Sequence, residues 1–212
     1  MKRKTNCYLG LASAILLGIL SPAGATAPTG VSLGTGAPPG TLGPWTMAPI
    51  GPDASPVNSF VTSVGPVLFD EAVTHAQIGN GWASWSHGYA GDVYHTYSSV
   101  NTTSLTLTMS APISAIYFYA EPNDYTNFTF TATALSGASV TETIDGNAGA
   151  SGFGFYATGV DLITSITITE GNTAGFAVGE FGFSVPEPSS VALASLGLVL
   201  LVSRRIQRRT RS

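Results

Sequence analysis

The chain has 212 residues, of which 44% are hydrophobic and only 9% are charged. All eight Lys and Arg residues lie in the first four or the last nine positions, so residues 26–203 contain twelve acidic and no basic residues and have a formal charge of −12. This charge excludes nucleic-acid binding, because phosphate contacts need cations. It also repels anionic membranes and acidic polysaccharide unless a divalent cation lies between them.

Residues 1–25 have the three parts of a secretory signal peptide. A basic start at residues 2–4 is followed by an apolar run at 9–20 and by small residues at 23–25 that fit a cleavage site. We therefore expect the secretion machinery to export the protein across the inner membrane. The single cysteine, Cys7, precedes the apolar run, so lipidation is not expected and the mature chain has no thiol.

Residues 26–66 are rich in Gly, Pro, Ser and Thr and show neither helical nor strand periodicity. We interpret this stretch as a leader that lies against the following domain or is partly disordered. A first strand is expected near its end, within Val57–Phe69.

Strand patterns repeat through the second half of the chain. Ser104–Met109 and Asn127–Leu135 alternate apolar and polar residues, which is typical of strands with one buried face. Ile113–Ala120 is apolar on both faces and predicts a central strand. In Phe176–Phe183 the apolar phase changes, which predicts a bulge near Gly179. Further strands are expected at Val140–Ile144, Phe153–Ala157 and Leu162–Thr169.

Short strands separated by Gly, Asn and Asp turns predict an all-β fold for residues 67–184. No part of this stretch has a convincing 3.6-residue apolar period, which argues against helices. About 115 residues are enough for one sandwich core. We therefore expect an antiparallel β-sandwich that is jelly-roll-like rather than immunoglobulin-like.

Residues 185–212 form a separate segment with three parts. Pro186-Glu187-Pro188 is an extended turn, Val191–Val202 is apolar, and five arginines follow, beginning with Arg204 and Arg205. As a helix the apolar run would span about 18 Å, against about 30 Å of bilayer hydrocarbon. We therefore expect a short C-terminal transmembrane or sorting helix that anchors the precursor transiently in the inner membrane. The arginines favour the cytoplasmic side.

The order of these parts resembles the PEP-CTERM sorting signal of Gram-negative bacteria that produce exopolysaccharide. The resemblance implies recognition by an exosortase, cleavage near Pro186-Glu187-Pro188 and transfer to the cell surface. Stretches within His75–Phe183 are also similar to small secreted PEP-CTERM proteins of unassigned function. We therefore expect a non-enzymatic surface or extracellular-matrix protein that an exosortase cleaves and that associates with exopolysaccharide.

Aromatic residues are concentrated between Trp82 and Tyr97. Exposed Trp and Tyr rings stack on sugars and a nearby carboxylate binds hydroxyl groups, so a carbohydrate-binding module is the alternative function. Its candidate residues are Trp82, Trp85, Tyr89, Asp92 and Tyr94. The competing interpretation is that these aromatic residues fill the sandwich core.

Two turns offer oxygen ligands of the kind that calcium prefers. The candidate ligands are Glu121, Asn123 and Asp124 in one turn and Asp145 and Asn147 in the other. The same residue types are also ordinary turn formers, so the alternatives of no cofactor and of calcium both stay open.

The sequence contains no recognisable catalytic motif. His75, His87 and His95 are spaced by twelve and then eight residues, which matches no compact zinc motif. The twelve acidic residues allow many carboxylate pairs and specify none. A glycoside hydrolase or another hydrolase is therefore the least favoured function.

Overall fold

The computed structural model describes residues 27–42, 45–46, 48–50, 58–96, 102–158, 161–171 and 175–185. These residues form strands and turns without a helix, which confirms the all-β prediction for this part of the chain. Consequently, none of the described residues forms a helix long and apolar enough to cross a membrane. The signal peptide, the sorting helix and the motif residues Pro186, Glu187, Pro188, Arg204 and Arg205 lie outside the described residues.

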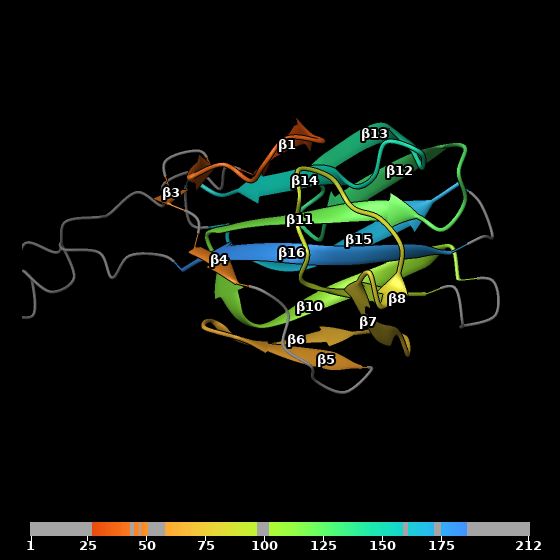
Figure 1. Cartoon of the computed structure of the whole chain (residues 1–212). Coiled ribbons are helices and arrows are strands. Elements are labelled where there is room, and N and C mark those ends of the chain that lie inside the picture. Colours follow the sequence, from red (N-terminus) through yellow and green to blue (C-terminus); the bar gives the residue numbers. More distant parts are fainter. Residues whose placement is uncertain are drawn as a thin grey trace, which may run out of the picture.

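The strands form two large sheets that pack face to face (Figure 1). The eight-stranded sheet contains, in spatial order, β1 (Thr29–Gly34), β14 (Ser151–Tyr156), β11 (Ala115–Pro122), β16 (Phe176–Ser184), β9 (Asp92–His95), β7 (Thr74–Ile78) and β8 (Gly81–Trp82), and β4 (Ala48–Ile50) also pairs with β16. The six-stranded sheet contains β13 (Ser139–Asp145), β12 (Asn127–Ala134), β15 (Ile163–Glu170), β10 (Ser104–Ile113), β6 (Gly65–Phe69) and β5 (Ser59–Thr62). A separate pair consists of β2 (Thr41–Leu42) and β3 (Trp45–Thr46).

From β9 onward the chain passes repeatedly between the two sheets. The eight-stranded sheet has the local order β14-β11-β16-β9, and the six-stranded sheet has the order β13-β12-β15-β10. Within these two orders only β12 and β13 are neighbours both in sequence and in a sheet. The last strand, β16, lies between β11 and β9, so the centre of the eight-stranded sheet is complete only when β16 pairs.

The core lies between the sheets, and residue alternation decides which side chains enter it. Leu105, Leu107 and Met109 of β10 are buried there, as their spacing predicts. Phe130 of β12 enters in the same way. All eight residues of β11 are buried, which confirms the predicted central strand.

The predicted bulge in β16 is present. The register between β11 and β16 shifts between Tyr117 and Tyr119, and Glu180 on β16 has a φ of 53°. Because of this shift, Val178 and Phe181 both face the core, although they are three positions apart and would face opposite sides of a regular strand. The same shift leaves Glu180 on the outer face of the sheet.

Glycine shapes that outer face. In β14 and β16 glycines alternate with core phenylalanines, so the glycines lie on the outside. A Cβ atom at Gly182 would overlap the ring of Tyr117, and one at Gly152 would overlap the ring of Tyr119. The two tyrosine rings of β11 therefore rest directly on the backbone of the neighbouring strands.

The stretch 26–66, which we expected to be a leader, contributes strands to both sheets. β1 pairs with β14, and β5 pairs with β6 and places Phe60 in the core. These strands are short and are separated by stretches rich in glycine and proline, so no period is long enough to read from the sequence. The strand-containing domain therefore begins well before residue 67.

Candidate functional site

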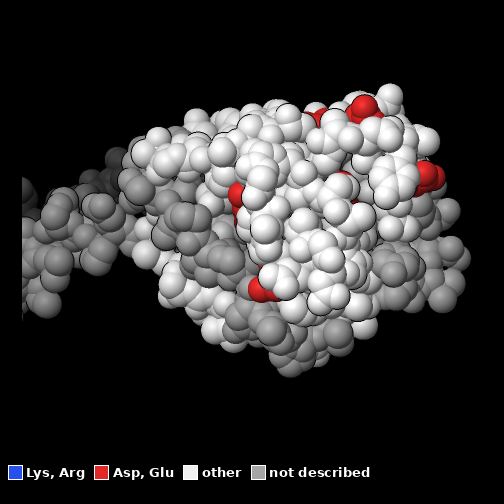
Figure 2. Space-filling model, in the orientation of Figure 1, with Lys and Arg blue, Asp and Glu red and all other residues white. Residues whose placement is uncertain are grey.

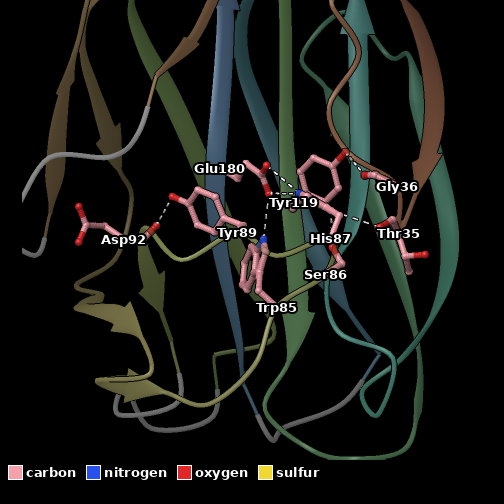
Figure 3. Close-up of polar contacts among 9 residues, drawn as sticks. All are labelled: Thr35, Gly36, Trp85, Ser86, His87, Tyr89, Asp92, Tyr119 and Glu180. Atoms are coloured by element: carbon pink, nitrogen blue, oxygen red, sulfur yellow. Dashed lines mark hydrogen bonds and ion pairs between the residues drawn. The ribbon is translucent and has the colours of Figure 1, made fainter.

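The most connected polar cluster of the described chain surrounds Glu180 (Figure 3). The side chain of Glu180 is only 10% exposed. Its carboxylate accepts a hydrogen bond from Trp85 Nε1 at 3.1 Å, and His87 Nε2 lies 2.8 Å from both carboxylate oxygens. A non-glycine residue with positive φ is uncommon, and here it turns the carboxylate toward the loop that carries Trp85 and His87.

The other ring nitrogen of His87 extends the cluster. His87 Nδ1 lies 2.9 Å from Ser86 Oγ and 3.2 Å from the carbonyl oxygen of Thr35. A protonated imidazole can donate to Thr35 and to Glu180 together, whereas a neutral one can donate to only one of them. Nearby, Tyr119 donates its hydroxyl to the carbonyl oxygen of Gly36 at 2.7 Å, which ties the same loops to β11.

Three tyrosines lie close to the Glu180 carboxylate. Burial, followed by the negative charge of Glu180, raises the pKa of Tyr89 and of Tyr119. The same two causes raise the pKa of Tyr117 to about 12. All three phenols are therefore neutral near pH 7, and Tyr89 donates its hydroxyl to the carbonyl oxygen of Asp92 at 2.9 Å.

Ser86, His87 and Glu180 are the residue types of a hydrolytic triad, but their arrangement differs from one. Ser86 is buried, and its hydroxyl contacts the ring of the adjacent His87. A serine nucleophile must instead reach a substrate carbonyl. The contacts of the cluster join the Trp85–Tyr89 loop, the Thr35–Gly36 turn and β16, so the cluster fixes these loops on the outer face of the sheet.

Replacing Glu180 by alanine is therefore expected to lower the free energy of unfolding by about 2–3 kcal/mol, because His87 and Trp85 lose a charged acceptor. Equilibrium urea unfolding measures the change. Glu180→Gln, which keeps one acceptor oxygen, should cost less. Equal losses in the two variants would show that the carboxylate contacts do not hold the loop.

A second carboxylate, Glu121, lies at the end of β11. It is 2% exposed, and it accepts hydrogen bonds from Trp82 Nε1 and from Ser84 Oγ, both at 2.7 Å. Burial raises the pKa of Glu121, and the two hydrogen bonds offset part of the rise. A cavity of about 160 Å³ adjoins it, lined by Gly81, Trp82, Ala83, Ser84, Glu121, Pro122, Asn123 and Tyr125.

Two of the five predicted sugar-binding residues are buried. Tyr94 lies in the core between the sheets, with its ring 5.3 Å from that of Phe60. Trp82 is 7% exposed and turns its indole N–H toward Glu121. Neither ring is exposed on the surface as a stacking platform, although Trp82 lines the cavity beside Glu121. Tyr94 is buried because it lies on the inner face of β9, and Trp82 of β8 is buried because it packs against Ala76, Val93 and Ala177.

The other three predicted sugar-binding residues are partly buried. The rings of Trp85 and Tyr89 lie 6.0 Å apart, and their polar atoms are bonded to Glu180 and to the backbone of Asp92. Asp92 Oδ1 lies 3.1 Å from His75 Nε2. Tyr97 lies outside the described residues. The structure therefore places these side chains near one another, although each already has a protein partner.

The two turns with candidate calcium ligands lie together in space. Asn147 Nδ2 donates to the carbonyl oxygen of Tyr125 at 2.6 Å. The candidate carboxylates bond to backbone amides: Asp124 Oδ1 accepts from Tyr125 at 2.7 Å, and Asp145 Oδ1 accepts from Asn147 at 2.9 Å. Glu121 faces Trp82 and Ser84 instead, and Asn123 lines the adjoining cavity.

Metal-ligating side chains are dispersed in the described residues. None of them form a group of three or more His, Cys, Asp or Glu that could hold a metal ion. Each histidine has its own surroundings: His75 lies beside Asp92, His87 beside Glu180, and His95 stacks on Trp82 at 5.6 Å. Burial lowers the pKa of His95, which favours its neutral form.

The charge of the visible face agrees with the sequence. Figure 2 shows scattered acidic side chains on that face and no Lys or Arg. Every described residue falls within 26–203, the stretch without basic residues. The described surface therefore has no cationic group other than a protonated histidine.

Glu180 and Tyr125 are among the residues of these clusters that the sequence did not identify. Glu180 is a lone acidic residue in an apolar strand, and it lies where the apolar alternation is predicted to change phase. This position was the one sequence feature that could have identified it. Tyr125 lies in a turn and is 62% exposed, although aromatic residues are usually buried. An isolated tyrosine in a turn carries no periodic signal, so only the structure identifies it.

The comparisons with known proteins concern the end of the chain. A family model, the PEP-CTERM protein-sorting motif, matches residues 184–209, which include Pro186-Glu187-Pro188, the apolar run, Arg204 and Arg205. No curated protein sequence matches the chain. The chain therefore carries a PEP-CTERM sorting motif, which marks it as an exported, membrane-passing precursor with an exosortase as its processing partner.

Proposed function

We propose that the protein is a non-enzymatic surface or extracellular-matrix protein that an exosortase cleaves at its C-terminal motif and that associates with exopolysaccharide. The observation that carries this proposal is the junction of domain and motif. The motif begins at Ser184, which is also the last residue of β16. Cleavage within Pro186-Glu187-Pro188 would remove the apolar run and the arginines and leave β16 whole.

The strand order supports delivery of a finished domain. Eight strands, β9 to β16, lie four in each sheet with the orders β14-β11-β16-β9 and β13-β12-β15-β10. This is the order of a double-sheet jelly roll made of two Greek keys. Because β16 fills the centre of one sheet, the domain is complete where the motif starts.

The charge distribution supports release from the membrane. Residues 26–186 contain eleven acidic residues and no basic residue. Loss of the tail, together with loss of the signal peptide, would remove every Lys and Arg that could hold the precursor at anionic headgroups. The processed chain would then be repelled from the membrane surface and free to enter the matrix.

The surroundings of the carboxylates support a non-enzymatic role. Glycoside hydrolysis usually needs two carboxylates that face each other across a cleft. Among the described residues, the cavity beside β11 is lined by one carboxylate, Glu121, and a second cavity is lined by one, Asp161. Glu180 is held by Trp85 and His87.

Replacing Pro186, Glu187 and Pro188 together by alanine is expected to block loss of the tail. Intact mass and cell fractionation in a host with its exosortase would show an uncleaved, membrane-bound chain. A matched control changes Ser189 and Ser190 to alanine inside the same motif and keeps normal processing. The proposal would be overturned if the triple variant lost its tail and were released as the wild type is.

The second candidate function is a carbohydrate-binding module. The cavity beside Glu121 favours it, because an exposed aromatic ring and a buried carboxylate line the same small space. Its residues differ from those that the sequence suggested, since only Trp82 belongs to both sets.

A further inference from the structure

We propose that the cavity between Gly81–Ser84 and Glu121–Tyr125 binds one neutral sugar unit. The inference rests on the proposed association with exopolysaccharide, and it names the site and the class of sugar. The cavity has a volume of about 160 Å³. Protein cavities of about 150 Å³ hold a molecule the size of benzene, so a single six-membered ring matches this space.

Both walls of the cavity are fixed before any ligand binds. On one side, Gly79 and Gly81 have φ values of 81° and 99° and form a tight turn that leads into Trp82. That turn is closed by hydrogen bonds from Gly79 to Trp82 at 2.7 Å and from Asn80 to Gln77 at 2.8 Å. A preformed site loses little entropy on binding.

The opposite wall is held by the neighbouring turn. The backbone of Tyr125 donates to Asp124 Oδ1 at 2.7 Å and accepts from Asn147 Nδ2 at 2.6 Å. Gly146 donates to the carbonyl oxygen of Thr126 at 2.9 Å. The side chains that suggested calcium thus hold an exposed tyrosine in place at the mouth of the cavity.

Glu121 joins the two walls and supplies the specific polar contact. Its two oxygens each accept one hydrogen bond, from Trp82 and from Ser84, and this fixes the direction of the carboxylate. A carboxylate has about four lone-pair sites, so each oxygen can still accept a second donor. A hydroxyl group of a ligand in the cavity is a donor of this kind.

The lining narrows the class of ligand. An anion is disfavoured, because Glu121 lies in the wall and residues 26–203 contain no Lys or Arg. A metal ion is disfavoured, because Glu121 is the one carboxylate, histidine or cysteine among the lining residues. A fully apolar ligand would leave the Glu121 carboxylate buried without solvent.

Neutral sugars fit the remaining requirements better than amines. Ser84 and Asn123 carry groups that both donate and accept hydrogen bonds, and sugar hydroxyls do the same, whereas an ammonium group only donates. The ring of Tyr125 offers an apolar surface at the opening, which suits the C–H face of a sugar ring. One ring can therefore contact Tyr125 by its face and Glu121 by its edge.

The test uses the mature protein as it is purified from the cells that export it. An array of immobilised neutral, N-acetylated, amino-bearing and uronic-acid oligosaccharides is followed by calorimetric titration with the neutral oligosaccharide that binds best. We expect binding to neutral or N-acetylated probes. Tyr125→Ala should weaken it by about tenfold or more, whereas Tyr125→Phe, which keeps the ring, should bind within about threefold of wild type.

A matched control changes Leu135, which is 78% exposed and lines the separate cavity that contains Asp161. Leu135→Ala should bind like wild type. The inference is overturned if only amino or uronic-acid probes bind, if no probe binds, or if Tyr125→Ala binds as well as the unchanged protein. The sorting proposal and the sugar-binding inference fail in different measurements. The variant with alanines at 186–188 should lose processing but keep the cavity, so it should still bind sugar.

Discussion

Phe60→Ala is expected to lower the free energy of unfolding by about 3–5 kcal/mol. Phe60 is fully buried and comes from β5, at the edge of the six-stranded sheet. Its ring lies 4.6 Å from that of Phe181 and 5.3 Å from that of Tyr94, which belong to strands of the eight-stranded sheet. Removing Phe60 would leave a cavity at the contact between the two sheets.

Urea unfolding followed by tyrosine and tryptophan fluorescence measures this loss. Val61 is the matched control, because it is the next residue of β5 and is 55% exposed. Val61→Ala should change the free energy of unfolding by about 0.5 kcal/mol or less. A similarly small effect of Phe60→Ala would mean that β5 contributes little to the domain, and the leader interpretation of residues 26–66 would then hold.

The predictable part of the fold is the part with long, regular strands. β10, β11 and β12 follow from period-two alternation or from continuous apolar sequence, and the bulge near Gly179 follows from a phase change. β1 escaped prediction because its partner, β14, lies more than a hundred residues later. Local pattern cannot report a pairing between such distant segments, especially through glycine-containing strands.

The sites were less predictable than the strands. The sequence shows that Trp82 and Tyr94 are aromatic, but it does not show which face of the sheet each one occupies. The structure buries both and exposes Tyr125 instead. The role of Glu121 depends on contacts with Trp82 and Ser84, which lie 39 and 37 residues away in sequence. Contacts at such separations arise from topology, which single-residue patterns do not specify.

The stability of the domain is expected to fall between pH 6.5 and pH 8 because of Glu170. This residue points into the core beside its strand partner Phe130, is 2% exposed, and has no hydrogen-bond partner at either carboxylate oxygen. Burial, followed by the charge of Asp124, raises its pKa from 4.5 to about 8. Between these two values the folded chain holds a proton that the unfolded chain has released.

A carboxyl group whose pKa is higher in the folded than in the unfolded chain adds to the free energy of unfolding at low pH. This contribution is lost as the pH rises through the pKa of the folded chain. For Glu170 the fall from pH 6.5 to pH 8 amounts to about 1.5 kcal/mol. Glu121 changes the stability in the same direction as Glu170, because burial raises its pKa as well. His95 changes the stability in the opposite direction, because burial lowers its pKa. Its effect falls below its ordinary pKa of 6.5, and therefore below the range from pH 6.5 to pH 8.

Glu170→Gln is expected to flatten the fall, because the amide has the same shape and does not titrate. Thermal unfolding at several pH values between 6.5 and 8 measures it, with a melting temperature that drops by about 3–6 °C in the unchanged protein and stays nearly level in the variant. Glu71→Gln, which neutralises an exposed carboxylate, is the control and keeps the drop. An equal drop in Glu170→Gln would show that the buried carboxyl is ionised in the folded state, and a cation or donor would then have to reach it inside the sandwich.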